Sequence, residues 1–497
     1  MADYSKLVEG LRRSFKSGVT KSYEWRRKQL EGVLRLLDEN RDRIAKCLKE
    51  DLNKPTLEAT MYEIDYSRND LVDTMNNLKE WMKPEKVKKG LLNIMDTAYI
   101  QREPFGVALV MGAWNYPIQI TILPVFGALA AGNCVVLKPS ELAASTAQLL
   151  EELIPKYLDN DCVKVVNGGI PETTALLKER FEYIFYTGNT TVGKIVMKAA
   201  AEYLTPVTLE LGGKSPVYVD ENSDLSLVAR RISWGKLVNC GQTCIAPDYV
   251  MCKKDVQDKL VEECKKAMAE YYPDPAKSED YGRIINERHL HRIKKLIDGS
   301  GKLAIGGEVD ESQKYIAPTV LTDVKPTDPV MQEEVFGPVL PIMPISSDDE
   351  AISFINKGEK PLAMYIFSKN HDVAKKFLNN TSSGSFTFND TMMQAGLMTL
   401  PFGGVGSSGT GAYHGFHTFD TFCHKRAVLE RKHGGEGMVA IRYPPYSEKK
   451  GSIVRWIMKK TPNKSGLRTL VPYFLFGTIF AVLFKVYGFH NKIPFLQ

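Results

Sequence analysis

The sequence predicts an α/β protein with two Rossmann-like domains, each built on a parallel sheet, and three observations lead to this class. Short apolar runs rich in β-branched residues alternate with helical stretches, as buried parallel strands alternate with their covering helices. This rhythm occurs twice, on either side of a break near Thr205-Pro206. The chain has 497 residues, 43% of them hydrophobic and 25% charged, which suits about three globular units.

The first 80 residues are predicted to be helical, because apolar residues recur there near helical spacing among many charged residues. The recurring residues are Leu30, Val33, Leu34, Leu37 and Ile44. The apolar runs that predict strands are 107–111, 134–137 and 163–166 in the first region, and 216–219, 249–252 and 363–367 in the second. Helices are expected over 194–201, over 256–271 and around 374–378.

Charge and cysteine usage exclude several classes of protein. A net charge of +6 is mild for this length, and no basic run interleaved with aromatic residues indicates nucleic-acid binding. The eight cysteines have no regular spacing, and residues 1–16 are charged and lack the apolar core of a secretory signal. We therefore expect a protein body in the reducing cytosol without disulfides. Cys240 and Cys244 lack a second ligand pair, so no metal site is predicted.

The C-terminal part has a different composition. Basic residues cluster over 449–468, and a mainly apolar stretch follows over 470–489, interrupted by Lys485. Spanning a bilayer takes about 20 apolar residues, which this stretch supplies if Lys485 extends toward the interface. The sequence predicts a basic juxtamembrane segment over 443–468 and a transmembrane tail anchor over 469–489, with the body on the cytosolic side. A buried or interfacial helix is the alternative.

Cys244 is the candidate nucleophile. It lies among small residues in the segment NCGQTCIAP, 239–247, just before a predicted strand. An ordinary thiol, with a pKa of about 8.5, is only slightly ionised at neutral pH, so a nucleophilic cysteine needs a base or a positive environment. The alternative is that Cys244 is a small buried hydrophobic residue.

Glu210 is the candidate base. It stands between two leucines, at the end of an apolar run and before the Gly212-Gly213 turn. Partial desolvation there would raise its pKa toward the range useful for general-base catalysis. The alternative is a capping or salt-bridged carboxylate with a structural role.

A glycine-rich turn, YTGNTTVG at 186–193, leads from an apolar run into a predicted helix. The backbone N–H groups of such a turn and the helix dipole can bind a pyrophosphate. The turn departs from the usual dinucleotide fingerprint, because Thr190 stands where the second glycine would be. Alone, the turn is a weak signal.

Together, six motifs resemble the aldehyde dehydrogenase superfamily. They are Trp114-Asn115-Tyr116-Pro117, Lys138-Pro139-Ser140-Glu141, Glu210-Leu211-Gly212-Gly213-Lys214, Gly241-Gln242-Thr243-Cys244, Glu333-Glu334-Val335-Phe336-Gly337-Pro338 and Pro401-Phe402-Gly403-Gly404. The resemblance runs from about residue 5 to about residue 445. The short N-terminus, the turn at 186–189 and the apolar tail are most similar to the class 3 branch, and within it to membrane-bound fatty aldehyde dehydrogenases.

The resemblance implies roles for three catalytic residues. Cys244 attacks the aldehyde, Asn115 and the Cys244 backbone N–H stabilise the oxyanion, and Glu210 activates the water that hydrolyses the thioester. The implied cofactor-binding residues are Lys138, Glu141, Gly188, Asn189, Thr190, Thr191, Val192, Gly193, Glu334 and Phe336. The implied substrate pocket includes Tyr116 and Phe402.

The resemblance also implies the cofactor, the domains and the partners. A carboxylate at Glu141 accepts hydrogen bonds from a ribose 2′-hydroxyl and repels a 2′-phosphate, so NAD is expected, with NADP tolerated. The expected domains are 1–206 for NAD binding, 207–395 for the catalytic thiol and 396–442 as a segment that returns to the first domain. A small β element from 82–102 and the chain after Phe419 would form a homodimer. Medium- to long-chain fatty aldehydes and an endoplasmic reticulum membrane complete the expectation.

Three alternatives remain open. A non-catalytic NAD-binding protein on the same fold is disfavoured because Cys244, Glu210 and Asn115 are all present. A CoA-acylating semialdehyde dehydrogenase is disfavoured by Glu210 at the position of the base. A soluble class 3 enzyme for short or aromatic aldehydes differs from the favoured hypothesis only in the role of the tail.

Overall fold

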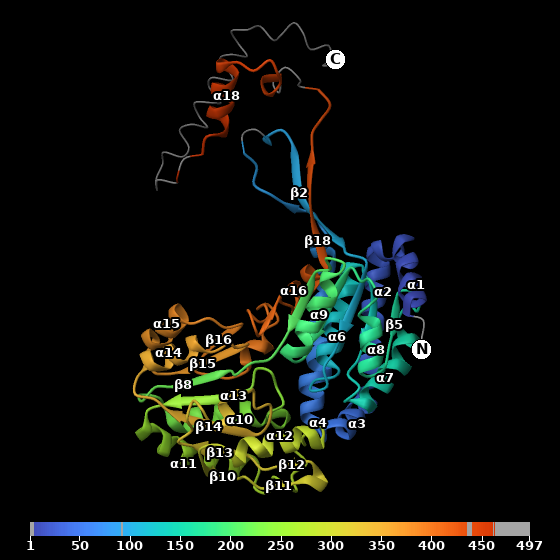
Figure 1. The fold of residues 1–497 in the computed structure, drawn as a ribbon. Coiled ribbons are helices and arrows are strands. Elements are labelled where there is room, and N and C mark those ends of the chain that lie inside the picture. The colour runs from blue at the N-terminus through green and yellow to red at the C-terminus, as the bar shows by residue number, and fades with distance from the viewer. Residues whose placement is uncertain (1–3, 91–92, 435–439, 461, 463–497) are drawn as a thin grey trace. The chain divides into compact units, whose positions relative to one another are not determined.

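The computed structural model describes residues 4–90, 93–434, 440–460 and 462, and the chain divides into two compact units (Figure 1). Unit 1 comprises Met1–Pro84 and Gln101–Arg426, and unit 2 comprises Glu85–Ile100 and Ala427–Gln497. Unit 1 contains both of the large sheets, and most neighbouring strands in them are parallel. The predicted α/β class with parallel sheets is therefore confirmed.

Helices occupy most of the first 80 residues, as predicted. They are α1 (Tyr4–Lys16), α2 (Tyr23–Glu39), α3 (Arg41–Leu52), α4 (Thr56–Glu58), the π-helix η2 (Ala59–Asp65) and α5 (Tyr66–Trp81). The Ser22 hydroxyl begins α2 by accepting the Trp25 N–H at 3.1 Å. Leu30, Val33 and Ile44, whose spacing predicted helices here, are fully buried.

A six-stranded sheet has the order β17-β7-β6-β3-β4-β5. Its strands are β3 (Val107–Met111), β4 (Cys134–Lys138), β5 (Val163–Val165), β6 (Tyr183–Thr187), β7 (Val207–Glu210) and β17 (Gly409–Thr410). All neighbours pair in parallel except β17, which is antiparallel to β7. The apolar runs at 107–111, 134–137 and 163–166 predicted strands correctly.

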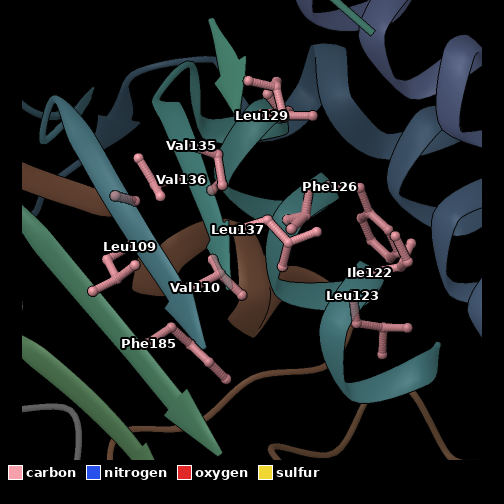
Figure 2. Close-up of a cluster of buried hydrophobic side chains, with 14 of the residues drawn as sticks. Leu109, Val110, Ile122, Leu123, Phe126, Leu129, Val135, Val136, Leu137 and Phe185 are labelled. Carbon is pink, nitrogen blue, oxygen red and sulfur yellow. The ribbon is translucent and has the colours of Figure 1, made fainter. Parts of the chain in front are cut away.

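Helix α6 (Gln119–Ala131) supplies much of the core of this sheet. Figure 2 shows its side chains against those of β3, β4 and β6; the labelled residues are Leu109, Val110, Ile122, Leu123, Phe126, Leu129, Val135, Val136, Leu137 and Phe185. All of them are fully buried. Burying one such side chain contributes about 1.5–3 kcal/mol to the stability of the fold. The packing therefore holds α6 in a fixed position against the sheet. The other helices beside the sheet are α7 (Ala144–Tyr157), α8 (Ile170–Leu176) and α9 (Thr190–Ala201).

A seven-stranded sheet has the order β10-β13-β14-β9-β8-β15-β16. Its strands are β8 (Pro216–Val219), β9 (Tyr249–Cys252), β10 (Lys302–Ile305), β13 (Thr319–Thr322), β14 (Val339–Pro344), β15 (Ala363–Phe367) and β16 (Ser385–Phe388). Only the edge strand β10 is antiparallel to its neighbour. The predicted strands at 216–219, 249–252 and 363–367 are confirmed.

Helices and short elements complete this half of unit 1. They are α10 (Leu225–Leu237), η4 (Val238–Gly241), α11 (Lys254–Tyr271), α12 (Glu287–Asp298), α13 (Pro329–Gln332), α14 (Asp348–Lys357), α15 (His371–Asn380), η6 (Met393–Gly396) and the hairpin β11 (Val309–Asp310) with β12 (Tyr315–Ile316). Helix α16 (Phe416–Thr421) packs instead against α5 and α6, beside the first sheet. The chain passes from one sheet to the other after β7. The predicted boundary at 206/207 groups β7 with the second region, whereas this strand lies in the first sheet, beside β6.

The strands β1 (Glu85–Lys86), β2 (Thr97–Pro104) and β18 (Cys423–Glu430) form a third sheet. They fall in the two stretches that were expected to supply a small β element. Helix α18 (Glu448–Met458) lies in the predicted basic segment. No helix of the described residues is long and apolar enough to cross a membrane, and the predicted anchor at 469–489 lies outside the described residues.

Candidate active site

A single large cavity in unit 1 brings the predicted site residues together. Its volume is about 1270 Å³, which exceeds the range of about 300–1,000 Å³ of ordinary ligand pockets. The predicted residues that line it are Asn115, Tyr116, Lys138, Glu141, Gly188, Asn189, Thr190, Val192, Glu210, Cys244, Glu334, Phe336 and Phe402. Thr191 and Gly193 do not line it, because Thr191 is exposed and Gly193 packs against Leu211.

The loop that carries Cys244 begins with an unusual backbone. Asn239, Cys240 and Gly241 have φ angles of 53°, 55° and 72°, three successive residues in the left-handed region. A side chain at Gly241 would also clash with the carbonyl oxygen of Gly337, so only glycine fits there. Conformations of this kind persist where the surrounding structure holds them, and they occur often at functional sites.

Cys244 is partly exposed to the cavity. Burial, followed by the nearby charges of Glu334 and Glu210, raises the pKa of the thiol to about 12, and the N–H groups of Cys244 and Ile245 oppose this shift. The thiol of Cys244 is therefore protonated at neutral pH, and it would need a proton acceptor to act as a nucleophile.

Glu210 ends β7 and is almost fully buried, with 3% of its surface exposed. Neither carboxylate oxygen has a hydrogen-bond partner among the described residues. Burial raises the pKa of Glu210 well above its ordinary value, as the flanking leucines predicted. An unpartnered buried carboxyl group facing a cavity is free to exchange a proton with a molecule that enters there.

Glu334 is the second carboxylate at the cavity. Burial, and then the charge of Asp248, raises its pKa to about 8, while the Gly213 N–H, Lys214 and Arg292 oppose the shift. The carboxylate lies against Gly212, where any larger residue would collide with it. Arg292 holds the backbone at this position and at the next residue by donating to the carbonyls of Glu334 (3.1 Å) and Val335 (2.6 Å).

Asn115 and Tyr116 connect the end of β3 to the start of α6. The Asn115 amide donates to the Gln242 carbonyl at 3.1 Å, which ties it to the Cys244 loop. The Tyr116 hydroxyl is 2.9 Å from the Thr243 hydroxyl. Both contacts reach the two residues that precede Cys244, so hydrogen bonds tie the Asn115 turn to the loop that carries the thiol.

The glycine-rich turn leads into the N-terminus of α9. Asn189 caps this helix by accepting the Val192 N–H at 2.9 Å. Since Gly188, Thr190 and Val192 line the cavity, the start of α9 faces it. A helix start with N–H groups toward a cavity suits a phosphate-bearing ligand.

Lys138 and Glu141 form an ion pair beside this turn. The ammonium group is 2.9 Å from Glu141 Oε2 and also donates to the Pro139 carbonyl at 2.9 Å. Burial acts to raise the pKa of Glu141, but the hydrogen bond from Lys138 prevails and lowers it. Glu141 is therefore an ionised acceptor, and 45% of its side chain is exposed.

Aromatic residues form part of the cavity wall. Trp114 packs against Phe336 at 5.4 Å and against His289 at 5.3 Å between ring centroids. Phe402 packs against His414 at 4.8 Å. Trp114 and His289 line the cavity but were not predicted as site residues. Trp114 could have been identified from its place beside Asn115 in the first motif, whereas His289 lies in a charge-rich helix without any such signal.

The donor set of the cavity fits a nicotinamide dinucleotide. A helix N-terminus, a lysine and an ionised carboxylate line one cavity whose volume is sufficient for a dinucleotide and a second molecule. No group of three or more His, Cys, Asp or Glu side chains in the described part of the chain could hold a metal ion.

Comparisons with known proteins agree with this geometry. Residues 1–428 match the Aldehyde dehydrogenase family. The chain is similar to "Aldehyde dehydrogenase family 3 member A2" of Macaca fascicularis, with 52% identity over 96% of this chain and 98% of the relative. It is also similar to "Aldehyde dehydrogenase, dimeric NADP-preferring" of Rattus norvegicus, with 52% identity over 90% and 98%. The substrate-bound structure of Staphylococcus aureus AldH matches with a TM-score of 0.89 and 38% identity, over 92% of this chain and 100% of that one.

Proposed function

The chain belongs to the aldehyde dehydrogenase family and is an NAD(P)-dependent aldehyde dehydrogenase, and on this premise we propose that it oxidises medium- to long-chain aliphatic aldehydes to carboxylic acids. The observation that carries the catalytic part of the proposal is the meeting of Cys244, Glu210 and Asn115 at one cavity. A thiol, an unpartnered carboxyl group and a side-chain amide are the groups that a thioester mechanism needs.

In the first step the Cys244 sulfur bonds to the aldehyde carbon and gives a thiohemiacetal. The thiol proton passes to a carboxylate of the cavity as the C–S bond forms, and from there to solvent before hydrolysis. Glu334 and Glu210 are the carboxyl groups whose charges act on the thiol. The developing oxyanion is stabilised by the Asn115 amide and the Cys244 backbone N–H. Such donors are effective because they are already oriented before the charge appears.

The nicotinamide ring, when bound, supplies the acceptor for the hydride that leaves the former aldehyde carbon. Hydrolysis of the resulting thioester on Cys244 then needs an activated water. Glu210, buried and without a hydrogen-bond partner among the described residues, takes the proton of that water. The C–S bond breaks, the carboxylic acid leaves and the thiol is restored.

For the cofactor we propose NAD, with NADP tolerated. Lys138 and Glu141, which form an ion pair at the cavity, would bind the adenosine ribose, and the ionised Glu141 would repel a 2′-phosphate. Gly188, Thr190 and Val192 at the start of α9 would bind the pyrophosphate, and Glu334 and Phe336 the nicotinamide end.

The proposed substrate class is supported by the apolar residues of the cavity wall. The residues of this wall include Tyr66, Ile120, Trp234, Ile245, Met392, Met398, Phe402 and Tyr413. Methionine side chains adapt to irregular apolar ligands, as a flexible alkyl chain requires. We also propose a homodimer anchored by residues 469–489 to the endoplasmic reticulum membrane, with the catalytic body in the cytosol. This location would bring the cavity to aldehydes dissolved in lipid.

The first test measures NADH formation with hexanal and hexadecanal for the wild type and for Cys244→Ala. We expect activity that rises with chain length and is lost in the variant. Cys47→Ala is the matched control, because Cys47 is also incompletely buried but lies on α3 and does not line the cavity. A wild type that prefers hexanal or an aromatic aldehyde would favour the soluble class 3 alternative.

The second test concerns the tail. We expect truncation after Arg468 to move the enzyme from the membrane fraction to the soluble fraction, with little change in kcat for hexanal. If the truncated protein stays with the membranes, the anchor lies elsewhere.

A further inference from the structure

A fully buried ion pair, Lys54 with Glu63, lies close to the active site but does not line the cavity. Lys54 Nζ is 2.5 Å from Glu63 Oε1, and neither side chain has any exposed surface. Glu63 belongs to the π-helix η2, whose residues Met61 and Tyr62 line the cavity. Short π-helical segments are rare and occur often at functional sites.

Both members of the pair hold the turn that carries Asn115. Lys54 Nζ donates to the Asn115 carbonyl at 3.0 Å and lies 4.0 Å from the centre of the Tyr116 ring. Glu63 Oε2 accepts the N–H groups of Ile118 (2.9 Å) and Gln119 (3.0 Å), where α6 begins. Through these hydrogen bonds the pair fixes the backbone of residues 115–119.

The loop that carries Cys244 also holds this turn through hydrogen bonds. Asn239 Nδ2 donates to the Asn115 carbonyl at 2.8 Å and to the Gln242 carbonyl at 3.1 Å. The Asn115 amide donates to that Gln242 carbonyl as well. The Asn115 carbonyl therefore receives one hydrogen bond from Lys54 and one from the loop that ends in the nucleophile.

Burying two charges is costly, and apolar replacements are often no less stable, so stability alone is a weak reason for such a pair. We infer that Lys54 and Glu63 are positioning residues for aldehyde oxidation, which act through the backbone of Asn115 to hold its amide beside the Cys244 backbone N–H. This inference rests on the oxyanion role proposed above for Asn115.

The test is a double-mutant cycle between the ion pair and Asn115. Lys54→Met with Glu63→Leu removes both charges and leaves neither unpaired. We expect kcat for hexanal to fall about 10- to 100-fold, the size of effect that misplacing a catalytic group produces. In an Asn115→Ala background the same pair of changes should cost less than about twofold, because the group that it positions is gone.

Two further readouts separate positioning from general damage. We expect the rate of Cys244 alkylation by iodoacetamide and the Kd for NAD to stay within about twofold of the wild type, because neither uses the Asn115 amide. A loss of folded structure would lower kcat, alkylation and NAD binding together. If the double variant does not fold, Glu63→Gln, which keeps an acceptor for the α6 N–H groups, takes its place in the cycle.

Arg12 and Glu182 provide a matched control. Arg12 donates to the Arg180 carbonyl (2.7 Å) and pairs with Glu182 (3.2 Å), which accepts the Val107 N–H (3.0 Å), so this pair also joins backbone segments. Neither residue lines the cavity. Arg12→Met with Glu182→Gln should leave kcat within about twofold.

These measurements distinguish the oxyanion role of Asn115 from the positioning role of Lys54 and Glu63. If Asn115→Ala itself leaves kcat unchanged, the oxyanion role fails. If Asn115→Ala lowers kcat and the ion-pair changes lower it further by their full factor, the oxyanion role stands and the positioning inference is overturned. A kcat loss equal to that of the control pair also overturns it.

Discussion

The two ends of the cavity differ in how their polar groups and backbone are stabilised. At the α9 end the charged groups and the helix start are paired: Asn189 caps the helix and Lys138 is paired with Glu141, although the Thr187 hydroxyl has no hydrogen-bond partner among the described residues. At the thiol end, Glu210 lacks a hydrogen-bond partner among the described residues, and Asn239 to Gly241 adopt left-handed backbone conformations. Buried unpaired groups and strained backbone both cost free energy, so that cost is concentrated where chemistry is proposed.

Because of this difference, we expect substitutions at the two ends of the cavity to affect stability and activity differently. Substitutions at the α9 end should alter binding or stability by modest amounts. Substitutions at the thiol end should alter turnover strongly and can leave stability intact.

The replacement Glu210→Gln should lower steady-state kcat about 10²- to 10⁴-fold, the range typical of a lost general base. Thermal stability should not fall, because the amide keeps the shape of the carboxyl group and carries no charge at a position where burial disfavours charge. Stopped-flow absorbance should still show a burst of NADH, since hydride transfer precedes hydrolysis. A variant without the burst would place Glu210 in the first step, and a variant with normal kcat would exclude it as the base.

The pH dependence of stability should report on Glu334. Its folded pKa of about 8 lies above its ordinary value of 4.5, so the folded protein keeps a proton that the unfolded chain loses between these values. The contribution of this group is present below about pH 4.5 and is lost as the pH rises to about 8. We therefore expect the Tm of Glu334→Gln minus that of the wild type to increase across this window and then to level off. A constant difference would show that the pKa is not raised.

Cofactor preference should change when Glu141 becomes Gln. Removing the charge that repels a 2′-phosphate should raise the ratio of kcat/KM for NADP to that for NAD about tenfold, which corresponds to about 1.4 kcal/mol. Glu202→Gln, an exposed carboxylate at the other end of α9, should leave the ratio unchanged. An unaltered ratio in Glu141→Gln would remove Glu141 from cofactor selection.

The smallest effect is expected at Asn189. Replacement by Ala removes the cap of α9 and should cost about 0.5–2 kcal/mol in urea unfolding, whereas Asn189→Asp keeps the cap and should restore most of it. The Kd for NAD should change less than the stability. A large loss of NAD binding at unchanged stability would contradict the capping role and indicate direct contact with the cofactor.

The strands were predictable from sequence because strands of parallel sheets are buried on both faces and therefore appear as continuous apolar runs. Val107–Met111 is fully buried, and so are its partners in β4. The desolvation of Glu210 was predictable for a similar reason, since its neighbours Leu209 and Leu211 pack inward with it. In both cases the signal is local in the chain.

The Lys54–Glu63 pair had no such signal. Both residues lie in a charge-rich helical region, where lysine and glutamate are normally solvent-exposed. Their burial arises from contacts with a turn more than fifty residues away, which no local pattern encodes. Thr191 was predicted as a site residue because the resemblance assigned the whole turn 188–193 to the pyrophosphate, but helical geometry directs its side chain to solvent.

The raised pKa of Cys244 affects the resistance of the enzyme to oxidation. Peroxides oxidise the thiolate form of cysteine, and a thiol with a pKa of about 12 holds almost none of that form at neutral pH. The resting enzyme should therefore tolerate the oxidising conditions under which lipid aldehydes arise. Its sensitivity to oxidative inactivation should increase only while ligands in the cavity are drawing the proton from the sulfur.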